Sequence, residues 1–571
     1  MRMRQSFLAF FALLLFSVSC KKQEKEVADL ILINGNIYTV DDSKLQAEAL
    51  AISGDRIMRV GSNSEIEALR GPETEVMDLE GQYVMPGFIE GHGHFSGLGQ
   101  SLMHLNFLKS KSWNEIVQAV AEKAKTAKPG EWIIGRGWHQ EKWTEPLDQN
   151  VLGYPYHDAL SAVSPNNPVV LRHASGHGLM ANAKAMELAG VTAETPNPSG
   201  GEIVRDSRGK AIGVFEERAM GVINQAYQEY LKTQSEEDRK NEWLKGIELA
   251  QEECLKKGVT SFQDAGSSFE EIDRYKELAE NGKLNLRLWV MIRHSYDMMK
   301  DKLGSFPWIN LGNHFLTVRG IKSELDGALG SFGAWLLAPY SDKKDFVGQN
   351  TTPVEEVKRI ATLAMENDLQ LCVHCIGDRA NQEVLNVFEK EFQSHPEKKD
   401  LRWRIEHAQH LDTSDIPRFK QLGVIASMQA IHCTSDAPFV VKRLGPDRAR
   451  YGAYPWRSLL DAGAVVTNGT DTPVEDVDPL ESLYATVTRK RPDSGLEFFP
   501  EQAMSRKEAI YSYTMACAYS AFEENDKGSL SPGKLADLII VSKDLVNCTD
   551  EEILESEILL TMVGGQVKYK K

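Results

Sequence analysis

Eight short apolar runs, each ending in polar residues, recur along the middle of this 571-residue chain and constrain its fold more than any other feature. Amphipathic stretches such as 353–367 and 381–392 lie between most of these runs. Strands that alternate with helices pair in parallel, and eight such units can close on themselves. The pattern therefore predicts an α/β protein built on a (β/α)8 TIM-type barrel. The expected strands are Tyr83–His92, Gly258–Asp264, Leu286–Ile292, Phe315–Ser323, Leu369–His374, Trp403–His407, Gly423–Met428 and Ala464–Asp471.

The two ends of the chain show a different pattern, of short β-strands and tight turns. We expect residues 28–82 and 523–571 to form one small β-sandwich domain beside a barrel of residues 83–522. Two unrelated terminal sheets would give the same pattern.

The first two expected barrel strands are too far apart for a single crossover. We therefore expect an insertion at about 100–250. Its strands should lie near 132–137 and 168–173, and its helices near 182–189 and 236–256.

The first residues have the composition of an export signal. Two arginines precede the apolar run 7–18, which is short for a membrane span and suits the core of a signal peptide. The segment up to Cys20 resembles a bacterial lipoprotein signal, departing from it at Ser17, where that family prefers leucine. The resemblance implies a signal peptide at 1–19, lipidation of Cys20, a tether at 20–27 and a membrane-anchored lipoprotein of a bacterial cell envelope. A signal cut elsewhere and an uncleaved anchor are the alternatives.

Charge and motifs exclude two classes of function. The formal net charge is −17 and no basic cluster stands out, so nucleic acid is not an expected partner. The chain has no Gly-x-Ser-x-Gly elbow, which argues against a serine hydrolase. A small-molecule substrate fits better, and a homo-oligomer remains open.

Polar residues at the ends of the expected strands form the candidate active site, because barrels of this type place their chemistry at the C-terminal ends of strands. In chain order these residues are His92, His94, Lys322, His374, His407 and Asp471. Imidazole nitrogen and carboxylate oxygen are ligands of borderline divalent metals. Buried together without a metal, so many polar groups would be costly. The set therefore predicts a metal centre at the rim of the barrel.

Several motifs in fixed order make the chain resemble the amidohydrolase superfamily. The motifs are Val84–His94, Gly137–Trp143, Ser175–His177, Gly258–Ser261, Gly320–Gly327, Val373–Ala380, Ile405–Gln409, Gly469–Glu475 and Gly528–Leu538. They resemble most closely the YtcJ-like group, which includes N-substituted formamide deformylases. The resemblance extends from about residue 29 to the end of the chain.

The resemblance implies two divalent metals, zinc by precedent. One would be held by His92, His94 and Asp471, and the other by His374 and His407.

Lys322, carboxylated by CO2, would bridge the two metals as an anion. If Lys322 is instead an ordinary cation, one metal is expected, with Glu216 or Asp264 completing its ligands.

The implied chemistry is hydrolysis by activated water. Two metals would lower the pKa of a bridging water and polarise the substrate carbonyl. Asp471 would accept the proton of the water and deliver it to the leaving nitrogen. His177, in a glycine-flanked loop, would act with it by binding the carbonyl or the oxyanion. The remaining candidates for substrate binding are Trp138, Asp326, Asp378 and Arg379, each with a structural role as the alternative.

Together these features predict a metal-dependent hydrolase of amide-like C–N bonds in amides, N-formyl compounds or cyclic amides. A related barrel that hydrolyses an ester or lactone, or deaminates an amidine, is the first alternative. A binding lipoprotein that keeps the barrel without turnover is the second.

Lipidation can be tested directly. Metabolic labelling with a fatty acid should mark the wild-type protein but not the Cys20→Ser variant, because the substitution removes the acceptor thiol. Equal labelling of both proteins would reject lipidation at Cys20.

Overall fold

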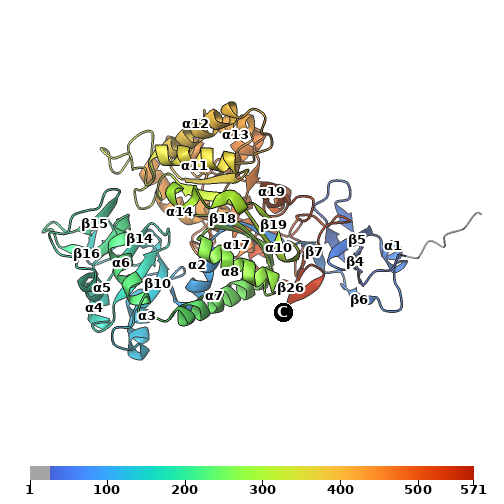
Figure 1. Cartoon of the computed structure of the whole chain (residues 1–571), viewed down its shortest axis with the longest axis horizontal. Helices are drawn as coiled ribbons and strands as arrows, with labels where there is room; N and C mark the ends of the chain where they lie inside the picture. Colours follow the sequence, from blue (N-terminus) through green and yellow to red (C-terminus); the bar gives the residue numbers. More distant parts are fainter. Residues whose placement is uncertain (1–25) are drawn as a thin grey trace, which may run out of the picture.

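The computed structural model describes residues 26–571 (Figure 1). The expected signal peptide, Cys20 and most of the expected tether lie outside the described residues. Within residues 26–571, no helix combines the length and the apolar character needed to cross a membrane.

Eight parallel strands form the central sheet. They are β8 (Phe88–Gly93), β17 (Val259–Ser267), β18 (Arg287–Ile292), β20 (Leu316–Glu324), β21 (Gln370–Cys375), β22 (Arg404–His407), β23 (Ile425–Ser427) and β24 (Val466–Thr467). Each pairs in parallel with the next. Between the first and last strands, Gly91 N donates to Asn468 O at 3.1 Å. The sheet is therefore a nearly closed barrel of the TIM type, and all eight expected strands overlap the observed ones.

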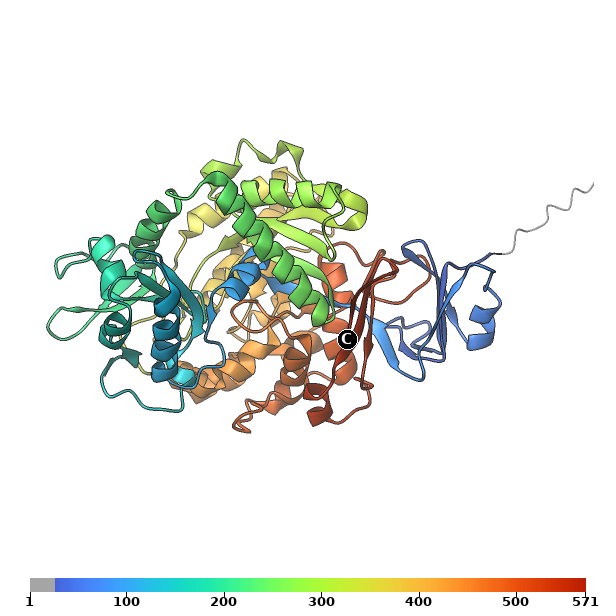
Figure 2. The same ribbon diagram turned by 90° about the horizontal axis from the view of Figure 1, so that it is seen from below.

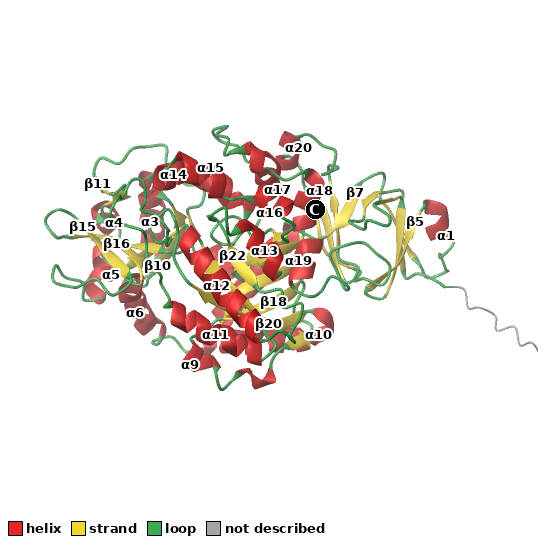
Figure 3. Cartoon of the chain, turned by 90° about the horizontal axis from the view of Figure 1, so that it is seen from above, coloured by secondary structure: helices red, strands yellow, loops and turns green. Residues whose placement is uncertain are grey.

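Helices cover the outside of this barrel (Figure 3). Their bounds are α2 (Phe95–Met103), α7 (Glu236–Lys256), α8 (Phe269–Glu280), α9 (Tyr296–Met299), α10 (Leu311–His314), α11 (Val354–Glu366), α12 (Asp378–Ser394), α13 (Ile416–Leu422), α14 (Ala430–Leu444), α15 (Pro446–Gly452), α16 (Trp456–Asp461), α17 (Pro479–Thr488), α18 (Arg506–Ser512) and α19 (Met515–Ser520). Helix α8 begins with a capping box of Ser268 and Glu271. In α12, Val384, Leu385 and Phe388 recur at helical spacing and are buried. Caps and apolar stripes of this kind explain why the helical stretches were recognisable in the sequence.

The first expected strand is in fact two strands. β7 (Tyr83–Pro86) pairs with β2 (Asn36–Tyr38) and β25 (Leu538–Val541) in a terminal sheet, and only β8 enters the barrel. The terminal module therefore extends to Pro86 instead of ending at residue 82. Both strands are fully buried, so the apolar run showed no break between them. Gly87 makes the crossing between the sheets, where a Cβ atom would clash with Thr260.

Both chain ends build the terminal module. One sheet has the order β27-β26-β25-β7-β2-β3 and the other β5-β4-β1-β6. The remaining bounds are β1 (Leu30–Ile33), β3 (Gln46–Ala47), β4 (Ala49–Ser53), β5 (Arg56–Gly61), α1 (Asn63–Glu67), β6 (Glu75–Asp78), α20 (Asp550–Leu554), β26 (Ile558–Val563) and β27 (Gln566–Lys570). Pairing of β7 with β25 joins the two ends in one sheet, so they are not unrelated. Side chains of both sheets share one apolar cluster. The interpretation as a β-sandwich stays a prediction.

The insertion is a second compact unit beside the barrel. Its sheet has the order β15-β16-β14-β13-β10-β9. Its elements are β9 (Leu105–Asn106), α3 (Trp113–Thr126), β10 (Ile133–Trp138), β11 (Asn150–Val151), β12 (Tyr154–Pro155), α4 (Asp158–Val163), β13 (Val169–His173), β14 (Gly178–Ala181), α5 (Ala183–Leu188), β15 (Gly201–Arg205), β16 (Ala211–Glu217) and α6 (Met220–Leu231). Figure 2 shows the insertion and the terminal module at opposite ends of the barrel. Helix α7, expected inside the insertion, packs instead on α2 and the barrel.

A buried ion pair ties the barrel to the terminal module, which allows a test of stability. Arg287 on β18 donates to Asp537 at 2.7 and 2.9 Å. Replacing Asp537 with alanine leaves the guanidinium buried without its partner. We expect the free energy of unfolding to fall by about 3–5 kcal/mol, measured by urea unfolding.

The matched control is Glu122→Ala, which removes an exposed pair with Lys125. That change should cost less than about 1 kcal/mol. A similar loss of unfolding free energy in both variants would show that the buried Arg287–Asp537 pair contributes no more to stability than an exposed pair.

Candidate active site

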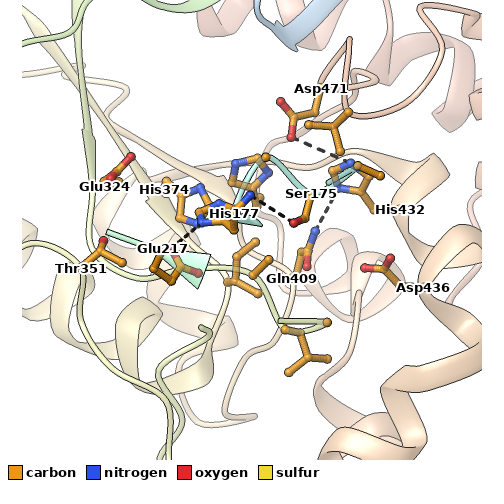
Figure 4. A pocket seen from close by; sticks show the side chains of 18 of the residues that line it. Ser175, His177, Glu217, Glu324, Thr351, His374, Gln409, His432, Asp436 and Asp471 are labelled. Atoms are coloured by element: carbon orange, nitrogen blue, oxygen red, sulfur yellow. Dashed lines mark hydrogen bonds and ion pairs between the residues drawn. The ribbon is translucent and has the colours of Figure 1, made fainter. Parts of the chain in front are cut away.

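A cavity of about 460 Å³ opens at the C-terminal ends of the barrel strands. Barrel and insertion both line it, and Figure 4 shows part of its wall. Among the lining residues are six of those expected from the sequence: His94, His177, Lys322, His374, His407 and Asp471. Elements far apart in the sequence thus converge at the rim where the metal centre was predicted.

His92, His94 and Asp471 converge on one point. The Nε2 atoms of His92 and His94 lie 3.6 and 3.2 Å from Oδ1 of Asp471. Two backbone hydrogen bonds hold these segments together: Asp471 N donates to His92 O at 2.8 Å, and His94 N donates to Thr472 O at 2.7 Å. The loop after β24 is therefore attached to the end of β8, which fixes the carboxylate against both imidazoles.

His407 and His374 extend this cluster. The ring centroid of His407 lies 4.6 Å from that of His92 and 4.5 Å from that of His374. Gln429 Oε1 lies 2.7 Å from Nδ1 of His407. Because Nδ1 of His407 has this partner, its Nε2 is left for a ligand.

Three non-glycine residues that line the cavity have a left-handed backbone: φ is +75° at His407, +56° at Asp471 and +48° at Glu217. Non-glycine residues adopt this conformation only when surrounding contacts enforce it. The strain therefore lies at residues that line the cavity, where it sets the direction of their side chains.

The donor set fits a divalent metal. One ligand atom each of His92, His407 and Asp471 lies within 4.8 Å of the others. Within the described chain, His374 Nε2 and Asp471 Oδ1 are buried without a hydrogen-bond partner. Burial holds the pKa of His374 and of His407 well below the ordinary value, so both rings are neutral and able to donate a lone pair. A metal ion bound here would give both unpartnered atoms a partner.

Lys322 lies within this cluster. Its Nζ is 3.4 Å from Nε2 of His92, and the residue is buried. Burial lowers the pKa of Lys322, which favours the neutral amine. The environment therefore works against an ordinary lysine cation at this position.

His177 comes from the insertion and lies beside His374, with ring centroids 5.3 Å apart. Its Nδ1 is 2.9 Å from Oε2 of Glu217. Burial opposes the charged form of His177, but Glu217 outweighs burial and raises the pKa of His177 to about 9. At neutral pH the ring is therefore cationic, and its Nε2–H is a donor at the cavity wall.

The structure does not bring the other expected substrate-binding residues to this cavity. Trp138 is fully buried in the insertion, where its Nε1 donates to Leu171 O at 2.7 Å. Asp378 accepts a hydrogen bond from Leu337 N at 2.8 Å, and Arg379 lies over the ring of Trp335. None of the three lines the cavity. The prediction was wrong here because position after a strand does not reveal which way a side chain turns.

Asp326 has a structural position behind His374. It is fully buried and accepts hydrogen bonds from the backbone N–H groups of Trp335, Ile376 and Gly377 at 2.8–2.9 Å. Its Oδ1 lies 3.8 Å from His374 Nε2. It therefore organises the loops that carry the ligand, instead of contacting the substrate as expected.

The two carboxylates considered for a one-metal site have other partners. Tyr154 donates to Glu216 at 2.6 Å inside the insertion, and burial raises the pKa of Glu216 to about 7. Asp264 accepts hydrogen bonds from Phe95 N and from the hydroxyl of Ser267. Neither lines the catalytic cavity.

Several residues of the site were not anticipated from the sequence. Glu406 contacts Nδ1 of His92, and Gln429 contacts His407. His432 lies 3.9 Å from Asp471 Oδ2 and bonds Gln409 at 3.0 Å (Figure 4). Glu406 directly precedes a predicted ligand, which was a usable signal. Gln429 and His432 follow the seventh strand, whose end carried no recognised ligand.

Comparison with known proteins agrees with this geometry. The family model described as "Amidohydrolase family" matches residues 75–569. The chain is 30% identical to "Putative amidohydrolase YtcJ" of Bacillus subtilis, over 94% of this chain and 98% of that one. It is 28% identical to "N-substituted formamide deformylase" of Arthrobacter pascens, covering 96% and 99%. It is also 32% identical to "Protein LONG AFTER FAR-RED 3" of Arabidopsis thaliana, covering 95% and 92%.

A solved structure supports the fold. An uncharacterized metal-dependent hydrolase from Pyrococcus horikoshii matches with a TM-score of 0.72 and 28% identity, covering 91% of this chain and 99% of that one. The resemblance predicted from the motifs is confirmed.

Removal of one expected ligand tests the metal centre. His374→Ala deletes a buried imidazole whose Nε2 has no protein partner. Loss of a residue that only hydrogen-bonds to a metal ligand typically lowers metal affinity by about tenfold to a hundredfold. Loss of the ligand itself should lower the affinity by at least that much. Elemental analysis after dialysis measures the bound metal.

His395→Ala is the matched control, because His395 follows the last residue of α12 and the polar contacts of its ring within residues 26–571 are with Glu391. Its metal content should equal that of the wild type. Full metal content in His374→Ala would rule out His374 as a ligand.

Proposed function

The chain belongs to the amidohydrolase family, and we propose on that premise that it hydrolyses amide-like C–N bonds in small molecules such as N-formyl or N-acyl amines. Metal-dependent hydrolysis in general follows from the family and from the matching metal-dependent hydrolase. The narrower C–N chemistry is supported by likeness to the formamide deformylase. One observation carries the proposal: histidine rings, a carboxylate and a buried lysine meet in a cavity that cationic His177 also lines.

We further propose two metal ions, zinc by ligand type, with a carboxylated Lys322 between them. Burial lowers the pKa of Lys322, so a neutral amine is available to attack CO2. A bond then forms between Nζ and the carbon of CO2, and one proton leaves to solvent. The product is an anion, which would attract two divalent metal ions, whereas an ammonium at this position would repel them. Metal bound at this site would polarise a carbonyl oxygen and lower the pKa of a water molecule.

The protein groups then have separate roles. The carboxylate of Asp471 accepts a proton from water and delivers it to the leaving nitrogen of the amide. Nε2–H of His177 donates to the carbonyl oxygen, where negative charge develops during attack. Glu217 keeps His177 protonated and oriented through its Nδ1. Nε2 of His432 lies 3.9 Å from Asp471 Oδ2 and has no hydrogen-bond partner among the described residues.

A matched substrate panel tests the bond type. N-formyl and N-acyl amines, the corresponding esters and lactones, and amidines are offered to protein loaded with zinc. We expect turnover of the amides to exceed that of the other two classes. Preferred hydrolysis of esters, or release of ammonia from amidines, would replace the proposal by the corresponding alternative. No turnover of any class by metal-replete protein would favour the non-catalytic alternative.

His177→Gln tests the proposed donor. We expect kcat to fall by about 10²–10³, as for the loss of one oxyanion donor, with unchanged metal content. In Glu217→Gln the ring of His177 is kept but loses the carboxylate that charges it, so a smaller loss of kcat is expected. If metal content falls together with kcat in His177→Gln, His177 serves the metal centre instead.

A further inference from the structure

A second cavity, of about 400 Å³, adjoins the catalytic one. It lies among α2, β10, α6 and α7, where the insertion meets the barrel. His94 and Arg136 line both cavities. The two cavities are therefore adjacent, with these two side chains at their common boundary.

The wall of this second cavity is strongly cationic. Four arginines line it, Arg136, Arg172, Arg239 and Arg274, against a single carboxylate, Glu242. Arg274 pairs with Glu270 at 2.6 Å. The other three have no carboxylate within 4.0 Å anywhere in residues 26–571. The second cavity therefore carries more positive charge from its arginines than the carboxylates around it can neutralise.

Arg136 and Arg172 are side by side, because they are register partners on the parallel strands β10 and β13. Nη2 of Arg136 donates to Ala174 O at 3.1 Å, and Nη2 of Arg172 donates to Asn224 Oδ1 at 3.1 Å. The Nε atom of Arg136 is buried without a partner among the described residues. Two neighbouring guanidinium groups therefore share one wall with most of their donors unused.

This arrangement costs stability unless an anion compensates it. Like charges on adjacent strands repel, and a buried cation without a counter-ion keeps its desolvation penalty. Burial, opposed by the more distant Asp471 and Glu475 and helped by Arg172, lowers the pKa of Arg136 to about 10. By contrast, Lys142 in the catalytic cavity is neutralised by Glu475 at 3.1 Å. Arg136, which lines both cavities, and Arg172 have no such partner among residues 26–571.

We propose that the second cavity is a substrate subsite in which Arg136 and Arg172 bind an anionic group, a carboxylate or a phosphate, while the scissile amide lies at the metal centre. The inference rests on the proposed C–N hydrolysis. Arginine is suited to this role because its planar fork donates two parallel hydrogen bonds to a carboxylate or phosphate. Met103, Tyr227 and Trp243 supply apolar wall for the part of the substrate between the two groups.

Two substrates that differ in one carboxylate test the inference. N-formylphenylalanine and N-formyl-2-phenylethylamine share the formamide and the phenyl ring, but only the first carries an anion. Arg136→Gln and Arg172→Gln should each lower kcat/KM for N-formylphenylalanine by about tenfold to a hundredfold, the value of one or two charge-assisted hydrogen bonds. The ratio of kcat/KM for N-formylphenylalanine to kcat/KM for the neutral amide should therefore fall in both variants. Equal loss on both substrates would overturn the inference.

Two further variants control for charge and folding. Arg208→Gln removes a positive charge from the surface of the same insertion, where Arg208 pairs with Asp206. It should leave the preference for the anionic substrate unchanged. Arg136→Lys keeps the charge but not the planar fork, so a loss smaller than that in Arg136→Gln is expected. A cooperative thermal unfolding transition in each variant, at a temperature no lower than that of the wild type, shows that the fold is retained.

Equilibrium binding separates this inference from the proposed reaction. Calorimetry with metal-replete protein compares 3-phenylpropionate, 3-phenylpropanamide and 2-phenylethyl phosphate. The two anions should bind at least about tenfold more tightly than the amide in the wild type, and this preference should vanish in both glutamine variants. The tighter of the two anions identifies the group. If the anions bind more tightly but no amide is hydrolysed, the anion subsite is supported and the proposed hydrolysis is rejected. If the anions bind no more tightly than the amide, the anion subsite is rejected.

Discussion

A carboxylate at the centre of the barrel, Glu406, governs the geometry of the active site. Glu406 is fully buried, its Oε1 lies 2.6 Å from Nε of Arg404, and its Oε2 contacts Nδ1 of His92. Burial favours the protonated acid, but Arg404 and His92 outweigh burial and hold the pKa of Glu406 well below the ordinary value. The charged carboxylate accepts the Nδ1 proton of His92, so Nε2 is presented to the cavity. Arg404 also donates to Gly91 O and Ser427 Oγ, both at 2.7 Å, and thereby ties β22 to β8 and β23. The ion pair that orients a ligand also braces the barrel, and the loss of either partner would leave a charge buried without compensation.

The barrel and the insertion contribute different parts of the site. Barrel strands carry the proposed metal ligands, whose positions depend on the closed sheet and on backbone bonds such as that between Asp471 and His92. The insertion contributes His177 with its partner Glu217, and also Arg136. The proposed metal ligands and the proposed donor His177 thus come from different parts of the chain. Such a division allows the substrate to change with the insertion while the barrel keeps the reaction.

Much of the fold could be predicted because its signals are local. Strand and helix periods, and caps such as Ser268 with Glu271, depend on residues close together in the chain. The candidate ligands could be predicted for the same reason: each follows an apolar run, and parallel strands place their ends on one rim. The residues that were expected to line the cavity but do not line it share one property. Trp138, Asp378 and Arg379 also follow strands, but they turn toward core or loop partners, and this depends on packing that no local pattern reports.

The sequence by itself determined the eight strand units, the order of the histidines, lysine and aspartate at their ends, and the family to which the chain belongs. Tertiary structure decided that Tyr83–Pro86 leaves the barrel for the terminal sheet, because two consecutive buried strands are indistinguishable in an apolar run. It also decided which groups stand behind the ligands, since Glu406 and His92 are 314 residues apart and meet only when the barrel closes. Unpaired charge is likewise a tertiary property. Arg136 and Arg172 are ordinary arginines in the sequence. Only the pairing of their strands places them together on one wall, where neither has a carboxylate within 4.0 Å among residues 26–571.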